Sequence, residues 1–224
     1  MNSTVEMFSF EEIQANHAVF RERSELYKKN GLDQEMVREN IMRQISDNSR
    51  SILEIGTGMG HLTTMLAHRF DRVVSIDVDG DCQRIAKLNA VHYGVLRNIE
   101  FIVSDAGKLA FPDCSFDAVV SAYAFHHFDF PFRVVREMAR IAKNQVVISD
   151  FNRKGFAVIE KLLSLEGRTH ERKSGDFSIV GVFLKELNFN VRTTIDDWQI
   201  LYSAFRKDST DFARSDKGPA GTIL

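Results

Sequence analysis

The stretch Ser51-Ile-Leu-Glu-Ile-Gly-Thr-Gly-Met-Gly-His61 decides the fold, because an apolar run leads into three closely spaced glycines. The run Ile52, Leu53 and Ile55 is typical of a strand that is buried on both faces of a parallel sheet. Glycine has no Cβ, so the backbone that follows can turn sharply and let a ligand lie against main-chain N–H groups. Apolar residues at helical spacing come next and indicate a helix that packs back onto the sheet. The stretch therefore predicts a strand, a nucleotide-cradling loop and a helix.

The spacing of the glycines separates two kinds of cofactor site. The dinucleotide fingerprint G-x-G-x-x-G needs its third glycine where this chain has His61, whereas Gly56, Gly58 and Gly60 give G-x-G-x-G. In this pattern the segment resembles the class I S-adenosylmethionine-dependent methyltransferases, whose loop surrounds the amino-acid end of the cofactor. Taken alone, the loop is equally compatible with a tight strand-to-helix turn that binds nothing.

Three further segments agree with the resemblance, each at the end of an expected strand. The run Arg72–Asp77 closes on a carboxylate about 20 residues after the first glycine, the spacing at which Rossmann-type folds hold a ribose. The run Ile99–Ala106 contains Asp105, an acid that the family places beside the adenine amino group. The run Ser115–Phe128 resembles the family's fourth strand and the loop after it, including the Phe-Asp pair that opens that strand.

The resemblance is closest over residues 50–151 and implies an α/β fold. We expect a Rossmann-like, seven-stranded, mostly parallel sheet with a C-terminal antiparallel hairpin and with helices on both faces. S-adenosylmethionine is the implied cofactor. The residues that the resemblance assigns to cofactor binding are Glu54, Gly56, Thr57, Gly58, Gly60, Asp77, Val78, Asp105, Ala106 and Ser121.

We expect three parts along the chain. Residues 1–47 form an N-terminal helical cap, with one helix from about Phe10 to Gly31 and a second helix capped by Asp33. Residues 48–207 form the cofactor-binding domain, in which strands and helices alternate and so indicate a parallel sheet. Residues 208–224 lack apolar periodicity, and we expect a disordered tail there.

The end of the domain predicts the antiparallel hairpin. Phe189–Ile195 and Trp198–Phe205 are two strand-like runs, and Asp196-Asp197 makes the turn between them. Gln145–Asp150 is the expected fifth strand. The connection Gly107–Cys114 is too short for a full helix before the fourth strand.

Composition limits the partners. The 224 residues carry 29 basic and 31 acidic side chains, a formal charge of −2, so no global positive field gathers nucleic acid or anionic membrane. Cys82 and Cys114 are too few for a disulfide framework or a zinc cluster of cysteines, and they fit a reduced, cytoplasmic setting. No run approaches the length of a membrane span. We therefore expect a small-molecule methyl acceptor, with nucleic acid and membrane disfavoured.

The acceptor pocket is expected around the fourth-strand loop. Ala122–Phe128 lacks the Asn-Pro-Pro-Tyr type of signature that related families use to hold an amide or a base amine. Its His-His-Phe ending is instead similar to small-molecule methyltransferases, so His127 is a candidate substrate residue. On the N-terminal helix, Phe20 and Tyr27 are the pocket candidates, although aromatic residues at helical spacing more often belong to a core. His126 or His127 is either a general base or a wall of the pocket.

A metal ion is not expected. Asp150, Asn152 and His170 are residue types that catechol-type methyltransferases use around magnesium. The adjacent Asp-Asn pair of that family is absent at the matching strand end, and turn chemistry accounts for the Asp-Phe-Asn spacing.

The expected function is S-adenosylmethionine-dependent methylation of a small molecule. Methylation of tRNA or protein through the charged segment Arg168–Lys173 is one alternative, and a cofactor-binding regulatory module without transfer activity is another. The longer segment Glu166–Gly175 is either a lid over the substrate or a solvated connection.

Overall fold

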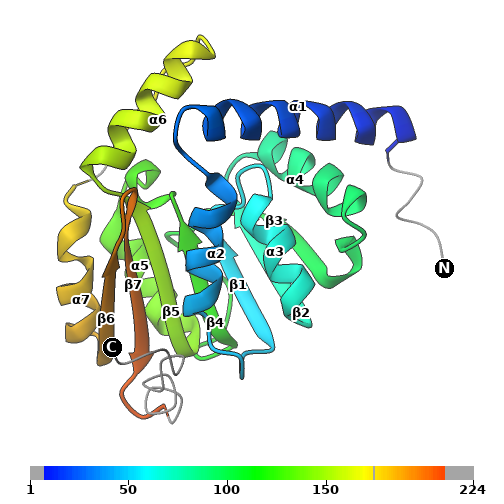
Figure 1. Ribbon diagram of the computed structural model, residues 1–224. Coiled ribbons are helices and arrows are strands. Elements are labelled where there is room, and N and C mark those ends of the chain that lie inside the picture. The colour runs from blue at the N-terminus through cyan, green and yellow to red at the C-terminus, as the bar shows by residue number, and fades with distance from the viewer. Residues whose placement is uncertain (1–7, 174, 210–224) are drawn as a thin grey trace, which may run out of the picture.

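The computed structural model describes residues 8–173 and 175–209, which form one layered α/β unit (Figure 1). Its sheet has seven strands in the order β3-β2-β1-β4-β5-β7-β6. The strands are β1 Ser51–Ile55, β2 Arg72–Asp77, β3 Ile99–Val103, β4 Phe116–Ala122, β5 Ala142–Phe151, β6 Phe189–Ile195 and β7 Gln199–Arg206. The helices are α1 Phe10–Lys29, α2 Gln34–Gln44, α3 His61–Arg69, α4 Gly80–His92, α5 Pro131–Ile141, α6 Arg153–Leu165 and α7 Val180–Glu186. Three short 3₁₀ turns are η2 Leu96–Asn98, η3 Phe125–His127 and η4 Phe177–Ile179.

The pairing confirms the predicted fold class. Strands β1 to β5 pair in parallel, while β7 runs antiparallel to both β5 and β6. The strand order reverses beside β1, whose neighbours are β2 and β4. Open α/β sheets bind their ligands at the carboxyl ends of the strands at such a reversal. The fold therefore directs attention to the loops after β1, β2 and β4.

Each face of the sheet carries its own apolar core. On one face, α2, α3 and α4 cover a core that includes Ile52, Leu66 and Val147. On the other face, α5 and α7 cover a core that includes Val119 and Phe116. These two layers hold the strand ends in a fixed frame.

Helices α1 and α6 lie beyond the carboxyl ends of the strands and are visible along the top of Figure 1. A third apolar cluster joins α1, α2 and α6 through Tyr27, Val37 and Leu162. The predicted capping residue is confirmed, because the Asp33 side chain accepts hydrogen bonds from the backbone N–H groups of Glu35 and Met36 in the first turn of α2. The expected tail falls on residues that lie outside the described ranges, apart from positions 208 and 209.

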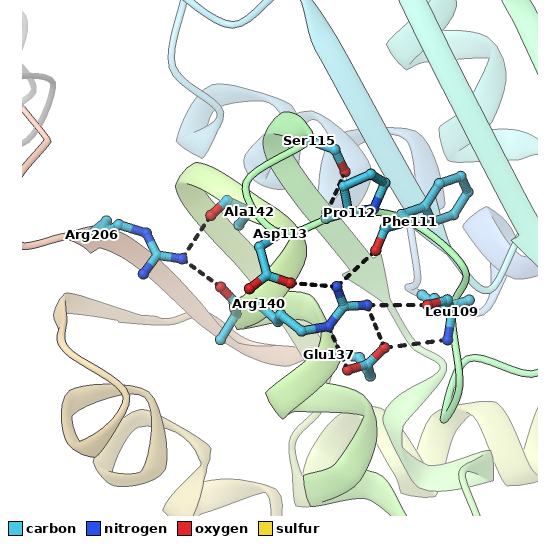
Figure 2. Close-up of polar contacts among 10 residues, drawn as sticks. Leu109, Phe111, Pro112, Asp113, Ser115, Glu137, Arg140, Ala142 and Arg206 are labelled. Atoms are coloured by element: carbon cyan, nitrogen blue, oxygen red, sulfur yellow. Dashed lines mark hydrogen bonds and ion pairs between the residues drawn. The ribbon is translucent and has the colours of Figure 1, made fainter.

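The opposite, amino-terminal ends of β4 and β5 are held by Arg140 at the end of α5. Figure 2 shows its guanidinium among the carboxylates of Glu137 and Asp113 and the backbone carbonyls of Leu109 and Phe111. The connection between β3 and β4 contains no helix, which agrees with the prediction that it is too short for a full one. Two of its carbonyl groups, those of Leu109 and Phe111, accept hydrogen bonds from this one side chain in place of helical hydrogen bonds.

Within the described ranges, no helix combines the length and the apolar character that crossing a membrane requires.

Candidate active site

The glycine loop after β1 has the conformation that its sequence requires. Gly56, Gly58 and Gly60 have φ angles of 88°, 51° and 77°, a region that residues with a Cβ rarely adopt. A Cβ added to Gly56 would lie 2.6 Å from the Cβ of Ala124, in the loop after β4. A Cβ added to Gly58 would meet nothing within 4 Å, so this position faces open space. A Cβ added to Gly60 would lie 2.7 Å from the Cβ of Ala86, so the loop packs tightly at two glycines and leaves open space at the third.

Asp77 at the end of β2 is joined directly to that loop. Its carboxylate accepts hydrogen bonds from the backbone N–H groups of Gly58 at 2.8 Å and of Asp79 at 3.0 Å. An ionised carboxylate has about four acceptor positions, so each oxygen keeps capacity for a further donor. Neutral hydroxyl groups of a ligand can therefore be bound without displacing the loop.

A cleft of about 440 Å³ opens at these strand ends, a volume in the range typical of small-molecule sites. It brings together six of the residues predicted from the sequence. They are Gly56, Asp77, Val78, Asp105, Ala106 and His127. The residues that the prediction missed include Phe128, Asp129, Arg133 and Lys173. The charged segment after α6 was the available signal for Lys173, while nothing in the sequence singled out Arg133.

The side chains of Glu54 and Thr57 lie beneath the loop and not on the cleft wall. Glu54 is 1% exposed, and its carboxylate accepts hydrogen bonds from Thr63 at 2.5 Å and from Ser75 at 2.6 Å. The Thr57 hydroxyl lies 2.7 Å from that of Ser75 and accepts from Gln83 at 2.8 Å. Burial raises the pKa of the Glu54 carboxyl to about 7, although the two hydroxyl donors oppose the shift. These side chains therefore support the loop from below.

Ser121 and Tyr27 also lie away from the cleft surface. The Ser121 hydroxyl is buried and donates to the backbone carbonyl of Ile55, which ties β4 to β1. Tyr27 is 2% exposed and packs in the cluster between α1, α2 and α6, where its hydroxyl accepts from Arg23 at 2.8 Å. Tyr27 is buried because α6 covers this face of α1. The structure thus corrects the placement of Tyr27 as a pocket residue.

A second cavity of about 430 Å³ lies between α1 and the glycine loop. Phe20, the other aromatic pocket candidate, lines it and stacks on His61 with ring centroids 3.9 Å apart. Met59 of the loop and Arg168 also line it. This cavity lies next to the glycine loop on the side of α1, so α1 contributes to the walls around the loop.

The segment after α6 packs over the strand ends. Glu166 forms an ion pair with Arg23 of α1 at 2.8 Å, and both side chains are largely buried. The backbone N–H of Lys173 donates to the carbonyl of His126 at 2.8 Å. The segment is therefore anchored to α1 and to the loop after β4.

Two histidines after β4 have different environments. His126 is buried, and its Nδ1 lies 2.7 Å from the Oδ1 of Asp150. His127 is exposed and lines the cleft. Desolvation of its ring lowers the pKa of His127 to about 4, and His126 and His170 contribute in the same direction. A base with so low a pKa accepts a proton poorly at neutral pH, which favours the wall role for His127.

Comparison with known proteins identifies the same domain. Residues 53–149 match the family model described as a methyltransferase domain. The chain is 35% identical over 92 residues to the uncharacterized methyltransferase YcgJ of Bacillus subtilis, which covers 41% of this chain and 36% of that protein. It is 30% identical over 133 residues to the demethylmenaquinone methyltransferase of Thermotoga maritima, which covers 59% of this chain and 52% of that protein. The chain thus spans about half, or less, of the length of these curated relatives.

The crystal structure of YcgJ has the same fold. It superposes with a TM-score of 0.59 at 19% sequence identity, over 76% of this chain and 97% of that one. The order of the strands, the conformation of the glycine loop and the residues matched by the family model all indicate the same kind of domain. Residues 53–149 are thus matched as a methyltransferase domain, and the chain is similar in sequence and fold to class I S-adenosylmethionine-dependent methyltransferases.

Proposed function

We propose that the chain binds S-adenosylmethionine in the 440 Å³ cleft and transfers its methyl group to a small-molecule acceptor. The observation that carries the proposal is the hydrogen bond between the Gly58 N–H and the Asp77 carboxylate, at the point where the strand order reverses. It gives the cleft a fixed acid, Asp77, which is bonded to a loop glycine whose Cβ position is open. Both features suit a ligand with ribose hydroxyls that lies against the backbone.

The residues present fit the cofactor in three places. Asp77 has acceptor capacity for the two ribose hydroxyls. Asp105 and Ala106 line the same cleft at the end of β3, where an acid can accept from the adenine amino group. The open space at Gly58 leaves room for the amino-acid end.

The bound cofactor supplies an electrophilic methyl group on a sulfonium centre. The protein's part is to align the acceptor with that group and to exclude water, because direct displacement depends chiefly on orientation. Phe128 and Lys173 on the cleft wall, and the Arg23–Glu166 pair that joins α1 to the segment after α6, suit that task. No general base is required for an acceptor that is already nucleophilic.

A small-molecule acceptor is favoured over a macromolecule by the charges of the segment after α6. Arg168, Arg172 and Lys173 each form an ion pair, with Glu166, Glu160 and Asp129 respectively. These ion pairs offset part of the positive charge of the segment, which makes it a weaker site for a phosphate backbone. The matched relative from Thermotoga maritima is named for a quinone, which is also a small molecule.

Transfer of a labelled methyl group tests the proposal. The protein is incubated with methyl-tritiated S-adenosylmethionine and, separately, with solvent-extracted small molecules, total RNA and protein from a bacterial extract. We expect label in the small-molecule sample, and less by about tenfold or more with the Asp77→Ala variant, because a charged hydrogen-bond partner contributes roughly 1.5–3 kcal/mol. Label in RNA or protein alone would favour the macromolecular alternative. Cofactor binding without label in any sample would favour the regulatory module.

A further inference from the structure

Three histidines from two distant parts of the sequence meet beside the cleft. His126 and His127 belong to η3, after β4, whereas His170 follows α6. One ring nitrogen of each lies within 4.8 Å of the others. We call this group the histidine cluster. None of the cleft residues assigned to the cofactor belongs to this cluster.

The hydrogen bonds around Asp150 fix the orientation of His126. Asp150 accepts the backbone N–H groups of His126 at 3.0 Å and of Phe151 at 2.8 Å, so its carboxylate acts as an acceptor. The Nδ1 of His126 therefore donates to the Oδ1 of Asp150 at 2.7 Å. As a result, the Nε2 of neutral His126 carries a lone pair, and this atom faces the Nε2 of His170 at 2.9 Å.

His170 has no tautomer that satisfies both of its ring nitrogens among the described residues. Its Nδ1 is buried and has no hydrogen-bond partner there. If the proton is on Nε2, the bond to His126 forms but the lone pair on Nδ1 is stranded. If the proton is on Nδ1, that N–H has no acceptor among the described residues and two lone pairs face each other at 2.9 Å. A cation between the two Nε2 atoms converts that repulsion into two bonds.

We propose that the histidine cluster binds one divalent transition-metal ion of the zinc class through His126, His127 and His170. Three imidazoles with a fourth position left for water form an established ligand set for Zn²⁺. The Asp150–His126 hydrogen bond is the outer contact that holds a ligating imidazole in the correct tautomer. The ring of His127 similarly hydrogen-bonds the backbone of Glu171.

The distances allow the site to form with small movements. Two nitrogens bound at 2.0–2.1 Å in a tetrahedral arrangement lie about 3.3 Å apart. The 2.9 Å separation of the two Nε2 atoms differs from this by a few tenths of an ångström. His127 has to approach by about 1.5 Å from the 4.8 Å limit, and its exposed position leaves room for that movement.

Such an ion fastens the segment after α6 to the end of β4. That segment already contacts the same loop through the Lys173 N–H and the carbonyl of His126. Because His127 and Lys173 both line the cleft, the ion stabilises one wall of it. The proposal concerns metal binding alone and is tested without cofactor or acceptor.

Cobalt titration of chelator-treated protein tests the proposal. We expect one Co²⁺ per chain, with the intense visible bands of a four-coordinate nitrogen site, and displacement of Co²⁺ by Zn²⁺. His170→Gln and His127→Gln should each weaken Zn²⁺ binding by about 100-fold or more, and Asp150→Asn by about 10- to 100-fold.

The matched control is His92→Gln. His92 stacks on His17 with ring centroids 3.7 Å apart. The substitution therefore removes an imidazole from a histidine pair that lies outside the histidine cluster. We expect this variant to bind Zn²⁺ like the parent, and thermal unfolding checks that every variant is folded. The proposal is overturned if no visible bands develop, or if folded His170→Gln and His127→Gln bind Zn²⁺ as the parent does. Equal weakening by His92→Gln would likewise overturn it.

Discussion

The carboxylate of Asp77 accepts a hydrogen bond from the backbone N–H of Gly58 at 2.8 Å, so the end of β2 and the glycine loop after β1 are one unit. Asp77 and Gly58 are 19 residues apart in the sequence. They meet because β1 and β2 pair in parallel, with Ile55 opposite Ile76. The register of the two strands therefore sets the position of the acid relative to the loop.

Replacing Asp77 by Ala should weaken S-adenosylhomocysteine binding by about 10- to 100-fold, because hydrogen bonds to a charged group contribute roughly 1.5–3 kcal/mol. Asp81→Asn is the control, since it removes the same charge from the exposed start of α4. Titration calorimetry measures both dissociation constants. If Asp77→Ala binds the ligand as tightly as Asp81→Asn, Asp77 is not a ligand.

Gly56→Ala should destabilise the protein more than Gly94→Ala does. Both glycines have positive φ angles, 88° and 69°, which cost an L-residue about 1–2 kcal/mol. Only at Gly56 does the new Cβ also collide, at 2.6 Å from Ala124, whereas nothing lies within 4 Å at Gly94. Urea denaturation gives the two changes in unfolding free energy, and equal values would refute the close packing of the loop.

Glu54 should make the protein less stable as pH rises from about 4.5 to 7. Burial raises its pKa in the folded protein to about 7, above the ordinary value of 4.5, so the folded state binds more protons than the unfolded state in this window. Stability then falls with rising pH, by a total of about 3 kcal/mol across the window.

The Glu54→Gln variant tests this effect because its side chain has a similar shape and does not titrate. Its unfolding free energy, measured by urea denaturation at several pH values, should lack the decline that the parent shows. The comparison uses the slope with pH and not the absolute stability. Parallel slopes for variant and parent would mean that Glu54 has an ordinary pKa in the folded protein.

Arg140→Ala should destabilise the fold by about 2 kcal/mol or more, because it removes charged hydrogen bonds to Glu137 and to two backbone carbonyls (Figure 2). Lysine at this position has one ammonium group in place of the planar guanidinium, so Arg140→Lys should restore only part of the loss. Neither variant should change the affinity for S-adenosylhomocysteine, since the network lies at the amino-terminal ends of β4 and β5.

This network should also contribute to acid sensitivity. The hydrogen bond with Arg140 lowers the pKa of the Glu137 carboxyl, so the stabilisation is present above the ordinary glutamate range and is lost as pH falls. Urea denaturation between pH 3 and pH 7 measures it. A parent and an Arg140→Ala variant with the same acid slope would contradict this role of the pair.

The sequence predicted the strand ends because local chemistry controls them. Three glycines at that spacing require unusual φ angles, and an acid that closes a β-branched run is recognisable without tertiary information. The side-chain direction of Glu54 was not recognised, although strand alternation places it on the face of Ile52 and toward Thr63 of α3.

Long-range packing accounts for the other differences between the prediction and the structure. Tyr27 is buried because α6, which is distant in sequence, covers its face of α1. His170 reaches His126 only through the length of α6 and the path of the segment after it. Helical periodicity and residue type contain no information on either contact.

The most direct test of the account is a crystal structure of the protein with S-adenosylhomocysteine, in which the distances from the ribose hydroxyls to Asp77 are measured. We predict that both hydroxyls lie about 2.6–3.0 Å from the Asp77 carboxylate oxygens, with the adenine beside Asp105 and Ala106. A ligand bound outside this cleft, or within it with the ribose out of hydrogen-bonding reach of Asp77, would contradict the account.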